Sequence, residues 1–224
     1  MSSVKSLSRR SPLSAERIIE AAVKVADLGG LTAVSMRNVG RELGVEAMSL
    51  YHHLANKDAL LEGLADWIFA QIELPREGSW WRDGMRLRAE SAREVLSAHP
   101  WSLGLIETRK NPGMALRTHH NAVLGCLMRD GFSARSATRA FSVIDAYIYG
   151  FVLSEHDLPF DAQDGATEWA AGMMPPADAF PYLQEIVTQL TQEGDYSFAA
   201  EFEYGLELIL DEIQRRHDAG VSGD

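Results

Sequence analysis

The feature that most restricts the fold is a pair of short helix-forming stretches on either side of Gly44. The first stretch, residues 36–43, follows a serine that can cap it and places four small or apolar residues on one face: Met36, Val39, Gly40 and Leu43. The second stretch covers about residues 46–53. Glycine between them permits a left-handed backbone, and Gly40 lets the two helices cross closely. Two short helices joined by such a turn predict a helix-turn-helix.

The remaining sequence predicts an all-α fold, because it contains no alternating strand pattern and no hairpin turn. We expect the first helix over residues 14–28, ended by Gly29-Gly30, and the fourth from about Lys57. Later helices are expected at about 84–98, 101–109, 113–130, 134–157, 182–192 and 195–217. The segment 158–181 contains four prolines and is expected to be a loop.

Charge is distributed unevenly along the 224 residues, whose net charge is −11. Residues 1–60 hold eight basic and six acidic side chains, a net charge of +2, so the rest carries −13. Such a chain is expected to contact phosphate with its N-terminal part only. The single Cys126, the lack of a signal peptide and the lack of a long apolar run favour a reducing, cytoplasmic location.

Two stretches of the sequence resemble a known family. Residues 14–64, "SAERIIEAAVKVADLGGLTAVSMRNVGRELGVEAMSLYHHLANKDALLEGL", are similar to the DNA-binding domain of the TetR family of transcriptional repressors. The stretch "HPWSLGLIETRKNPGMALRTHHNAVLGCLMRDGFSARSATRAFSVIDAYIYGF" resembles, more loosely, the tetracycline-repressor-like C-terminal domain. The resemblance implies a DNA-binding domain over residues 1–64 and a helical effector-binding and dimerisation domain over 65–224.

The resemblance also implies which residues contact double-stranded DNA: Arg37, Ala47, Met48, Ser49, Tyr51, His52, His53 and Lys57. Arg37 matches a position that reaches a guanine, whose O6 and N7 suit a forked donor. Ala47 and Met48 depart from the Gln-Pro pair of the pattern, so a thymine methyl contact is expected there. Tyr51 and Lys57 match phosphate-contacting positions, although Tyr51 can instead pack against the fourth helix. Residues 1–12 are interpreted as a tail or as a DNA-contacting arm.

Two later helices carry more apolar surface than one small bundle needs, which predicts a homodimer. The predicted interface consists of eight large side chains: Phe141, Ile144, Ile148, Phe151, Phe202, Leu206, Ile209 and Ile213. Ordinary core packing is the alternative for some of them.

An effector pocket is expected between the helices at 84–98, 101–109, 113–130 and 134–157. Its predicted walls and polar groups are Trp81, Met85, Arg88, Trp101, Leu105, His120, Asp145 and Tyr147. Asp145 lies among apolar residues and needs a partner, either Arg88 or a cationic or hydroxyl-bearing ligand. His120 is interpreted as a buried, hydrogen-bonded histidine or as a ligand contact.

Together with these patterns, the resemblance implies a DNA-binding transcriptional regulator, a repressor released from an inverted-repeat operator by a small molecule. The alternatives are an effector-independent DNA-binding protein and a helical enzyme that processes small molecules. The chain lacks a phosphate-binding glycine loop, HExxH, GxSxG and CxxC, so no enzyme activity and no cofactor are expected. No metal is expected at His52-His53, because adjacent helical residues point about 100° apart.

Overall fold

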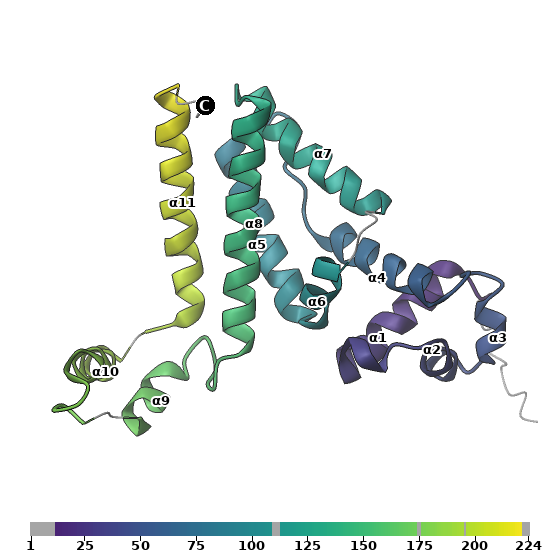
Figure 1. Cartoon of the computed structure of the whole chain (residues 1–224), viewed down its shortest axis with the longest axis horizontal. Coiled ribbons are helices and arrows are strands. Elements are labelled where there is room, and N and C mark those ends of the chain that lie inside the picture. Colours follow the sequence, from purple (N-terminus) through teal and green to yellow (C-terminus); the bar gives the residue numbers. More distant parts are fainter. Residues whose placement is uncertain (1–11, 109–112, 174–175, 195, 221–224) are drawn as a thin grey trace, which may run out of the picture.

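The computed structural model describes residues 12–108, 113–173, 176–194 and 196–220, and in these ranges the chain forms helices and no strand (Figure 1). The first four helices are α1 (Ala15–Ala33), α2 (Met36–Leu43), α3 (Ala47–Leu50) and α4 (Lys57–Gln71). The next four are α5 (Trp81–Ala98), α6 (Trp101–Thr108), α7 (Met114–Arg129) and α8 (Ala134–His156). They are followed by α9 (Ala166–Gly172), α10 (Pro181–Glu193), the 3-10 turn η1 (Phe198–Ala200) and α11 (Glu201–Asp218). The expected arm at residues 1–12 lies outside the described residues except for Pro12.

Two helices differ from the sequence prediction near the N-terminus. The predicted stop at Gly29-Gly30 is a kink, because Gly30 adopts φ 69° and a further turn then continues to Ala33. The third helix has only four residues, Ala47–Leu50, and the rest of the predicted stretch forms a turn. Both differences follow from local backbone geometry, which apolar spacing does not report.

A first apolar core joins α1, α2, α3 and the beginning of α4, and we call this part of the molecule the head. Ile18, Val39 and Leu60 are among its fully buried members. Leu105 of α6 also belongs to this core, although it lies 41 residues beyond the end of the predicted head domain at Leu64. The first core therefore takes in a side chain from the second predicted domain.

A second apolar core joins the end of α4 to α5, α7, α8 and α11, and we call this part the body. Leu64 of α4 lies in the first core and Ile68 in the second, so one continuous helix crosses from head to body (Figure 1). The division of the chain at residue 64 remains a prediction.

The segment 158–181 was wrongly expected to be only a loop, because it contains α9. Its alanine-rich turn buries Ala166 and Ala170 rather than large apolar side chains, so the usual helical pattern is weak. Helix α10 packs against α9, and both project from the body beyond the start of α11 (Figure 1). No helix in the described residues is long and apolar enough to cross a membrane.

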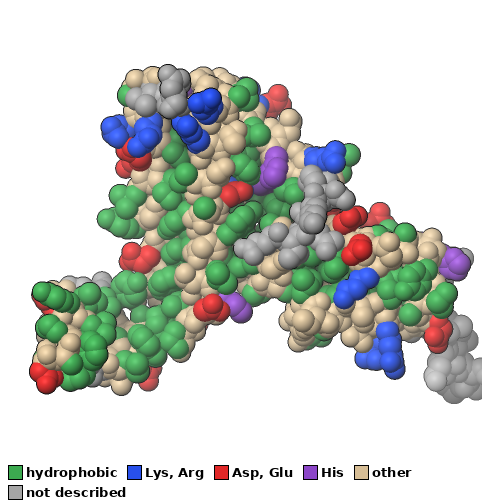
Figure 2. Space-filling view, in the orientation of Figure 1, with side chains coloured by type: hydrophobic (Ala, Val, Ile, Leu, Met, Phe, Trp, Pro, Cys, Tyr) green, Lys and Arg blue, Asp and Glu red, His purple; other side chains and the backbone are tan. Residues whose placement is uncertain are grey.

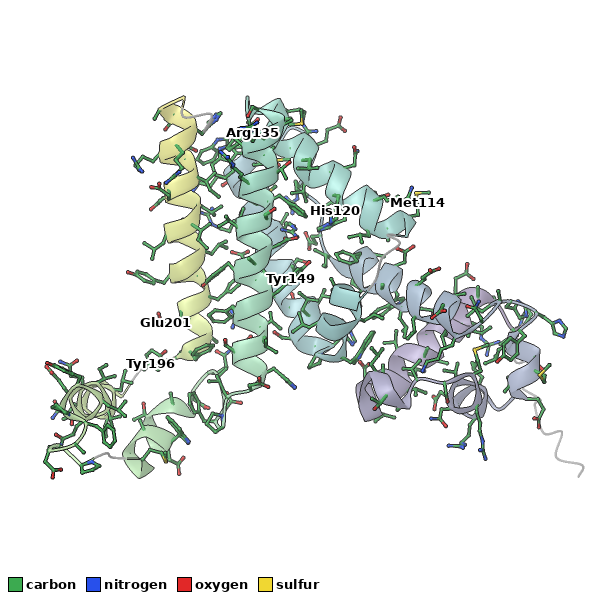
Figure 3. The ribbon with its side chains drawn as sticks, in the orientation of Figure 1. Met114, His120, Arg135, Tyr149, Tyr196 and Glu201 are labelled. Atoms are coloured by element: carbon green, nitrogen blue, oxygen red, sulfur yellow. The ribbon has the colours of Figure 1, made fainter. Side chains whose placement is uncertain are left out.

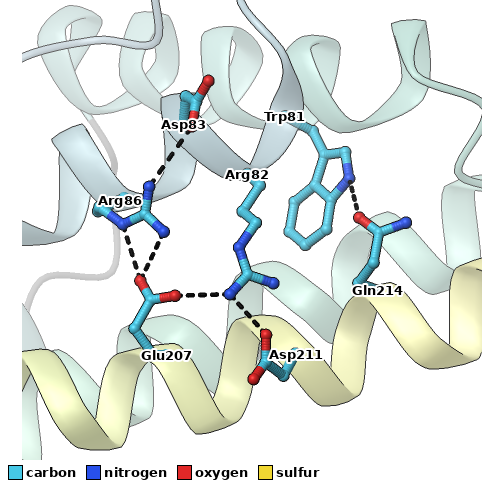
Figure 4. Close-up of polar contacts among 7 residues, drawn as sticks. All are labelled: Trp81, Arg82, Asp83, Arg86, Glu207, Asp211 and Gln214. Atoms are coloured by element: carbon cyan, nitrogen blue, oxygen red, sulfur yellow. Dashed lines mark hydrogen bonds and ion pairs between the residues drawn. The ribbon is translucent and has the colours of Figure 1, made fainter.

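Helix α11 is tied to the start of α5 by a network of charged side chains (Figure 4). Glu207 accepts hydrogen bonds from Arg82 at 2.5 Å and from Arg86 at 2.7 Å, and Arg82 also pairs with Asp211 at 2.6 Å. Next to these pairs, the Trp81 indole N–H donates to Gln214 at 3.1 Å. These bonds fix the position of α11 relative to α5.

Candidate nucleic-acid interface and ligand site

The turn between α2 and α3 depends on two glycines. Gly44 has φ 66° and ψ 36°, the left-handed conformation that the sequence predicts. At Gly40 an added Cβ would lie 3.0 Å from the carbonyl oxygen of Val45 and 3.3 Å from Cα of Ala47. A larger residue at position 40 would push α3 away from α2, so this glycine sets the crossing of the two helices.

The predicted DNA-contacting residues lie on α2, on α3, in the turn that follows it and at the start of α4. Leu50 is completely buried and anchors α3 to the head core. Outward-facing side chains surround it: Met48 is 72% exposed and Tyr51 is 44% exposed. Arg37, His52, His53 and Lys57 are also exposed, whereas Ala47 and Ser49 are half-buried. The exposure of these side chains leaves them available to a partner.

The N-terminus of α4 has the features of a helix end that binds an anion. Asn56 caps the helix, and its side-chain oxygen accepts a hydrogen bond from the Ala59 N–H at 2.9 Å. Lys57 is the first helical residue, so its ammonium group lies close to the positive end of the helix dipole. This combination suits a phosphate group.

Inside the body, the predicted ligand residues Arg88 and Asp145 are in direct contact. Arg88 is 1% exposed, and its Nη2 donates a hydrogen bond to Asp145 Oδ1. Of the two partners considered for Asp145, Arg88 is the one in contact with it. Burial raises the pKa of the Asp145 carboxyl group, and the positive charge of Arg88 opposes that rise.

His119, which the sequence analysis did not select, completes this cluster. It is 1% exposed, and its Nε2 accepts a hydrogen bond from Arg88 Nε at 3.1 Å. Burial, followed by the nearby charge of Arg88, lowers the pKa of His119 to about 3. The ring is therefore neutral near pH 7 and, with Nε2 as acceptor, carries its proton on Nδ1.

His120 is only half-buried, and its ring packs on Phe141 with the centroids 4.9 Å apart (Figure 3 labels His120 on α7). The fully buried, hydrogen-bonded histidine expected at position 120 is therefore found at position 119. The two neighbours share a helix with apolar residues on several sides, so spacing alone did not separate them. The contact that distinguishes the two histidines is the hydrogen bond from the buried Arg88 to His119.

Most of the other predicted pocket residues make their contacts away from Arg88. Met85 is fully buried in the body core, and Trp81 is bonded to α11. Tyr147 donates its hydroxyl group to the carbonyl oxygen of Phe202 at 3.0 Å, between α8 and α11. Leu105 lies in the head core, and Trp101 packs where head and body meet. The structure thus brings together Arg88, Asp145 and the adjacent His120, and it places Trp81 and Tyr147 against α11 and Leu105 and Trp101 at or next to the head core.

A polar contact joins the head to the body next to Trp101. Asp27 of α1 accepts a hydrogen bond from the Trp101 indole N–H at 2.7 Å, and the same oxygen lies 2.7 Å from Nδ1 of His99. Trp67 of α4 packs edge-on against His99, with the ring centroids 5.1 Å apart. The beginning of α6 is therefore held to α1 and to α4.

The predicted dimer residues divide into two groups. Four of them are buried in the chain's own core: Ile144, Ile148, Phe202 and Leu206. The other four, Phe141, Phe151, Ile209 and Ile213, are partly buried against that core. On the same helices, four apolar side chains that the prediction omitted are about half exposed or more: Val143, Leu153, Tyr204 and Leu208.

A groove of about 600 Å³ runs between the beginning of α8 and the end of α11. Ala140, Val143, Leu208, Ile209 and Ile213 contribute its apolar lining. Hydrophobic side chains also gather over α9 and α10, where Phe180, Tyr182 and Ile186 are more than half exposed (Figure 2). The groove and these exposed side chains together give α8 to α11 an apolar surface that is available to a partner.

Comparison with known proteins gives two family matches that together span most of the chain. Residues 18–64 match the family described as bacterial regulatory proteins, tetR family, and residues 74–216 match the tetracyclin repressor-like C-terminal domain. A tetracycline repressor of class A from Escherichia coli is 30% identical over 207 residues, covering 91% of this chain and 92% of that protein. An HTH-type transcriptional regulator from Saccharopolyspora erythraea is 33% identical over 150 residues, which is 66% of this chain and 64% of that relative's length.

Solved structures share the fold. The TetR family protein ActR from Streptomyces coelicolor, crystallised in complex with (S)-DNPA, superposes with a TM-score of 0.73 at 24% identity. The match covers 92% of this chain and 98% of ActR. Since the C-terminal family match alone covers more than half of the sequence, the chain belongs to the tetR family of bacterial regulatory proteins.

Proposed function

We propose that this protein is a homodimeric repressor that binds an inverted-repeat operator and leaves it when a small molecule binds the body. The observation that carries the proposal is the head surface, where a buried Leu50 holds outward-facing Met48, Tyr51, His52 and His53 around α3. A helix presented in this way suits the major groove of DNA.

Within the head, different side chains have different tasks in this proposal. Arg37, on the first turn of α2, reads a guanine, and the small Ala47 contacts a thymine methyl group. Lys57 and Tyr51 hold the DNA backbone and do not distinguish sequences. Two copies are needed because one head reads only half of an inverted repeat.

The proposed dimer uses the exposed apolar residues of α8 and α11, with α9 and α10 reaching toward the second copy. In this dimer, side chains of each subunit bind in the groove of about 600 Å³ between α8 and α11 of the other subunit. The acidic body, far from the operator, is kept away from phosphate by its charge.

The proposed effector is a mainly apolar, drug-sized molecule with one or two polar groups, bound near Arg88, His120 and Asp145. Arg88 keeps a buried Nη1 without a hydrogen-bond partner among the described residues, and an acceptor atom on the effector would satisfy it. Binding there would act on the head through α6, whose first residue is bonded to Asp27 and whose Leu105 enters the head core. The effector thus favours a body in which the two heads no longer match the operator spacing.

The deciding experiment has two steps. Genomic DNA fragments bound by the purified full chain are selected and sequenced, and an inverted repeat is expected. Small molecules are then screened for release of that DNA, first with the wild-type chain and then with His120→Ala. We expect this variant to keep operator affinity within a few-fold and to lose release; a protein that no compound releases is the effector-independent alternative.

A further inference from the structure

A second groove, of about 740 Å³, lies where the head meets the body. It is lined by α1, by α4 and by the first turns of α7, and its walls are mainly apolar: Ile19, Trp67, Phe69, Ile72, Leu74 and Met114 (Figure 3 labels Met114). The groove adjoins the Arg88–Asp145 contact through His119, which lines it and is bonded to Arg88, and it shares no lining residue with the groove between α8 and α11. Residues of the head and of the body line this groove together.

The charged side chains in the described lining of this groove have one sign. Its described lining includes three carboxylates, Glu16 and Glu20 from α1 and Asp66 from α4, and neither a lysine nor an arginine. Glu16 and Glu20 are exposed at the rim, and Asp66 is half-buried. An occupant with a positive charge would be attracted here, and an anion would be repelled.

A buried donor without a partner also lines the groove. His119 carries its proton on Nδ1 because Nε2 accepts from Arg88, and Nδ1 is buried with no hydrogen-bond partner in the described residues. A buried donor left unpaired costs free energy, which an acceptor atom on a bound molecule would recover. This signal is independent of the carboxylates.

We propose that the groove between α1, α4 and α7 binds a lipophilic organic cation that also carries a hydrogen-bond acceptor. The apolar walls exclude a hydrated inorganic ion, since such an ion would lose water without gaining enough oxygen ligands. The indole of Trp67 and the three carboxylates stabilise the positive charge, the apolar side chains bury the hydrocarbon body, and His119 Nδ1 donates to the acceptor atom.

Because the groove lies between head and body, a bound cation affects how these two parts are oriented. Helices α1 and α4 are packed without spare room beside it, because a Cβ added to Gly63 would lie 2.3 Å from Ile19 Cδ1. A molecule seated between this pair and α7 contacts head and body at once and therefore biases the angle between them. Glu16 and Glu20 are not residues of the proposed effector pocket, so a failure of cation binding at this groove would leave that proposal untouched.

Calorimetric titration of the full chain with two probes of equal shape and opposite charge tests the site. Tetraphenylphosphonium is expected to bind at least about tenfold more tightly than tetraphenylborate. Equal affinities would overturn the proposal. A second pair tests the acceptor: (2-hydroxyethyl)triphenylphosphonium should bind about threefold more tightly than ethyltriphenylphosphonium, as expected for one net hydrogen bond. No gain from the hydroxyl group would remove His119 from the site.

Matched variants locate the binding, because an acidic protein attracts cations in general. Glu16→Gln/Glu20→Gln should weaken phosphonium binding about fivefold or more, whereas Glu42→Gln/Glu46→Gln, which changes the net charge equally at exposed head positions outside the groove, should leave it unchanged. Thr118→Trp, at an exposed lining position of α7, should block all three phosphonium probes. Equal losses from the two double variants would show general attraction and overturn the site.

Discussion

At the scale of single residues, Arg37 and Lys57 are both exposed cations of the head, but only one is expected to read bases. Arg37→Ala should cost about 1–3 kcal/mol on the preferred operator and relax one base position. Lys57→Ala should weaken binding to all sequences alike and reduce the slope of affinity against salt by about one. Anisotropy titrations over a salt series with operator and scrambled DNA measure both effects.

The control is Arg41→Ala, which removes an exposed cation from the same helix as Arg37 without a predicted base contact. It should change affinity less than Lys57→Ala does and leave base preference intact. If Arg37→Ala and Lys57→Ala lower affinity equally on every sequence, the assigned roles are wrong.

A buried charge makes Asp145 more important for stability than its size suggests. In Asp145→Ala the Arg88 guanidinium group, 1% exposed, would lose its carboxylate partner, and we expect a loss of about 3–5 kcal/mol in the free energy of unfolding. Asp211→Ala is the matched control, because its side chain is 69% exposed and Arg82 keeps Glu207; a loss below about 1 kcal/mol is expected. Urea unfolding compares the two, and similar losses would contradict the argument.

At the scale of helices, the attachment of α11 to α5 should depend on pH through Glu207. The hydrogen bond from Arg86, together with that from Arg82, lowers the pKa of Glu207 below its usual 4.5. A lowered folded-state pKa adds stability that is fully present above the unfolded pKa and is lost as pH falls through the folded value. Glu207→Gln should therefore be about 1–2 kcal/mol less stable than wild type at neutral pH.

The measurement is urea unfolding of both proteins between about pH 7 and pH 3, where the difference should shrink below the usual glutamate pKa. Glu203→Gln, at an exposed position of the same helix, should show little difference at any pH. A gap between wild type and Glu207→Gln that stays constant with pH would contradict the ion-pair explanation.

Several elements were predictable because their signals are local. Gly44 and the cap Ser35 mark the ends of α2, and both were identified from sequence. The kink at Gly30 and the helix α9 were missed, since a left-handed glycine can end or bend a helix and an alanine face gives little periodicity. The burial of His119 depends on Arg88, 31 residues away, and no spacing rule along α7 reports such a contact.

At the scale of the whole molecule, dimerisation is expected to use residues that the single chain leaves uncovered. Leu208 on α11 is 54% exposed and lines the groove next to α8. Leu208→Glu should hardly change the stability of the subunit, but it should place a charge in the proposed interface. Light scattering should then give a mass near the 24.8 kDa of one chain instead of about twice that value.

Met128→Glu is the matched control, because Met128 is an apolar side chain of α7 with 50% exposure outside that groove. This variant should remain dimeric. If Leu208→Glu also remains dimeric at micromolar concentration, α11 is not at the centre of the interface.

The burial of Leu105 in the head core limits how freely this architecture can be recombined. Leu105, a side chain from the other part of the chain, completes the head core. Replacing a buried leucine with alanine typically lowers the free energy of unfolding by about 2–5 kcal/mol. A DNA-binding segment that ends at residue 64 would lack Leu105, and its core would be incomplete. Exchange of operator specificity between relatives should therefore succeed only when the transplanted segment brings its own α6, or when the recipient's sixth helix offers a side chain of matching shape.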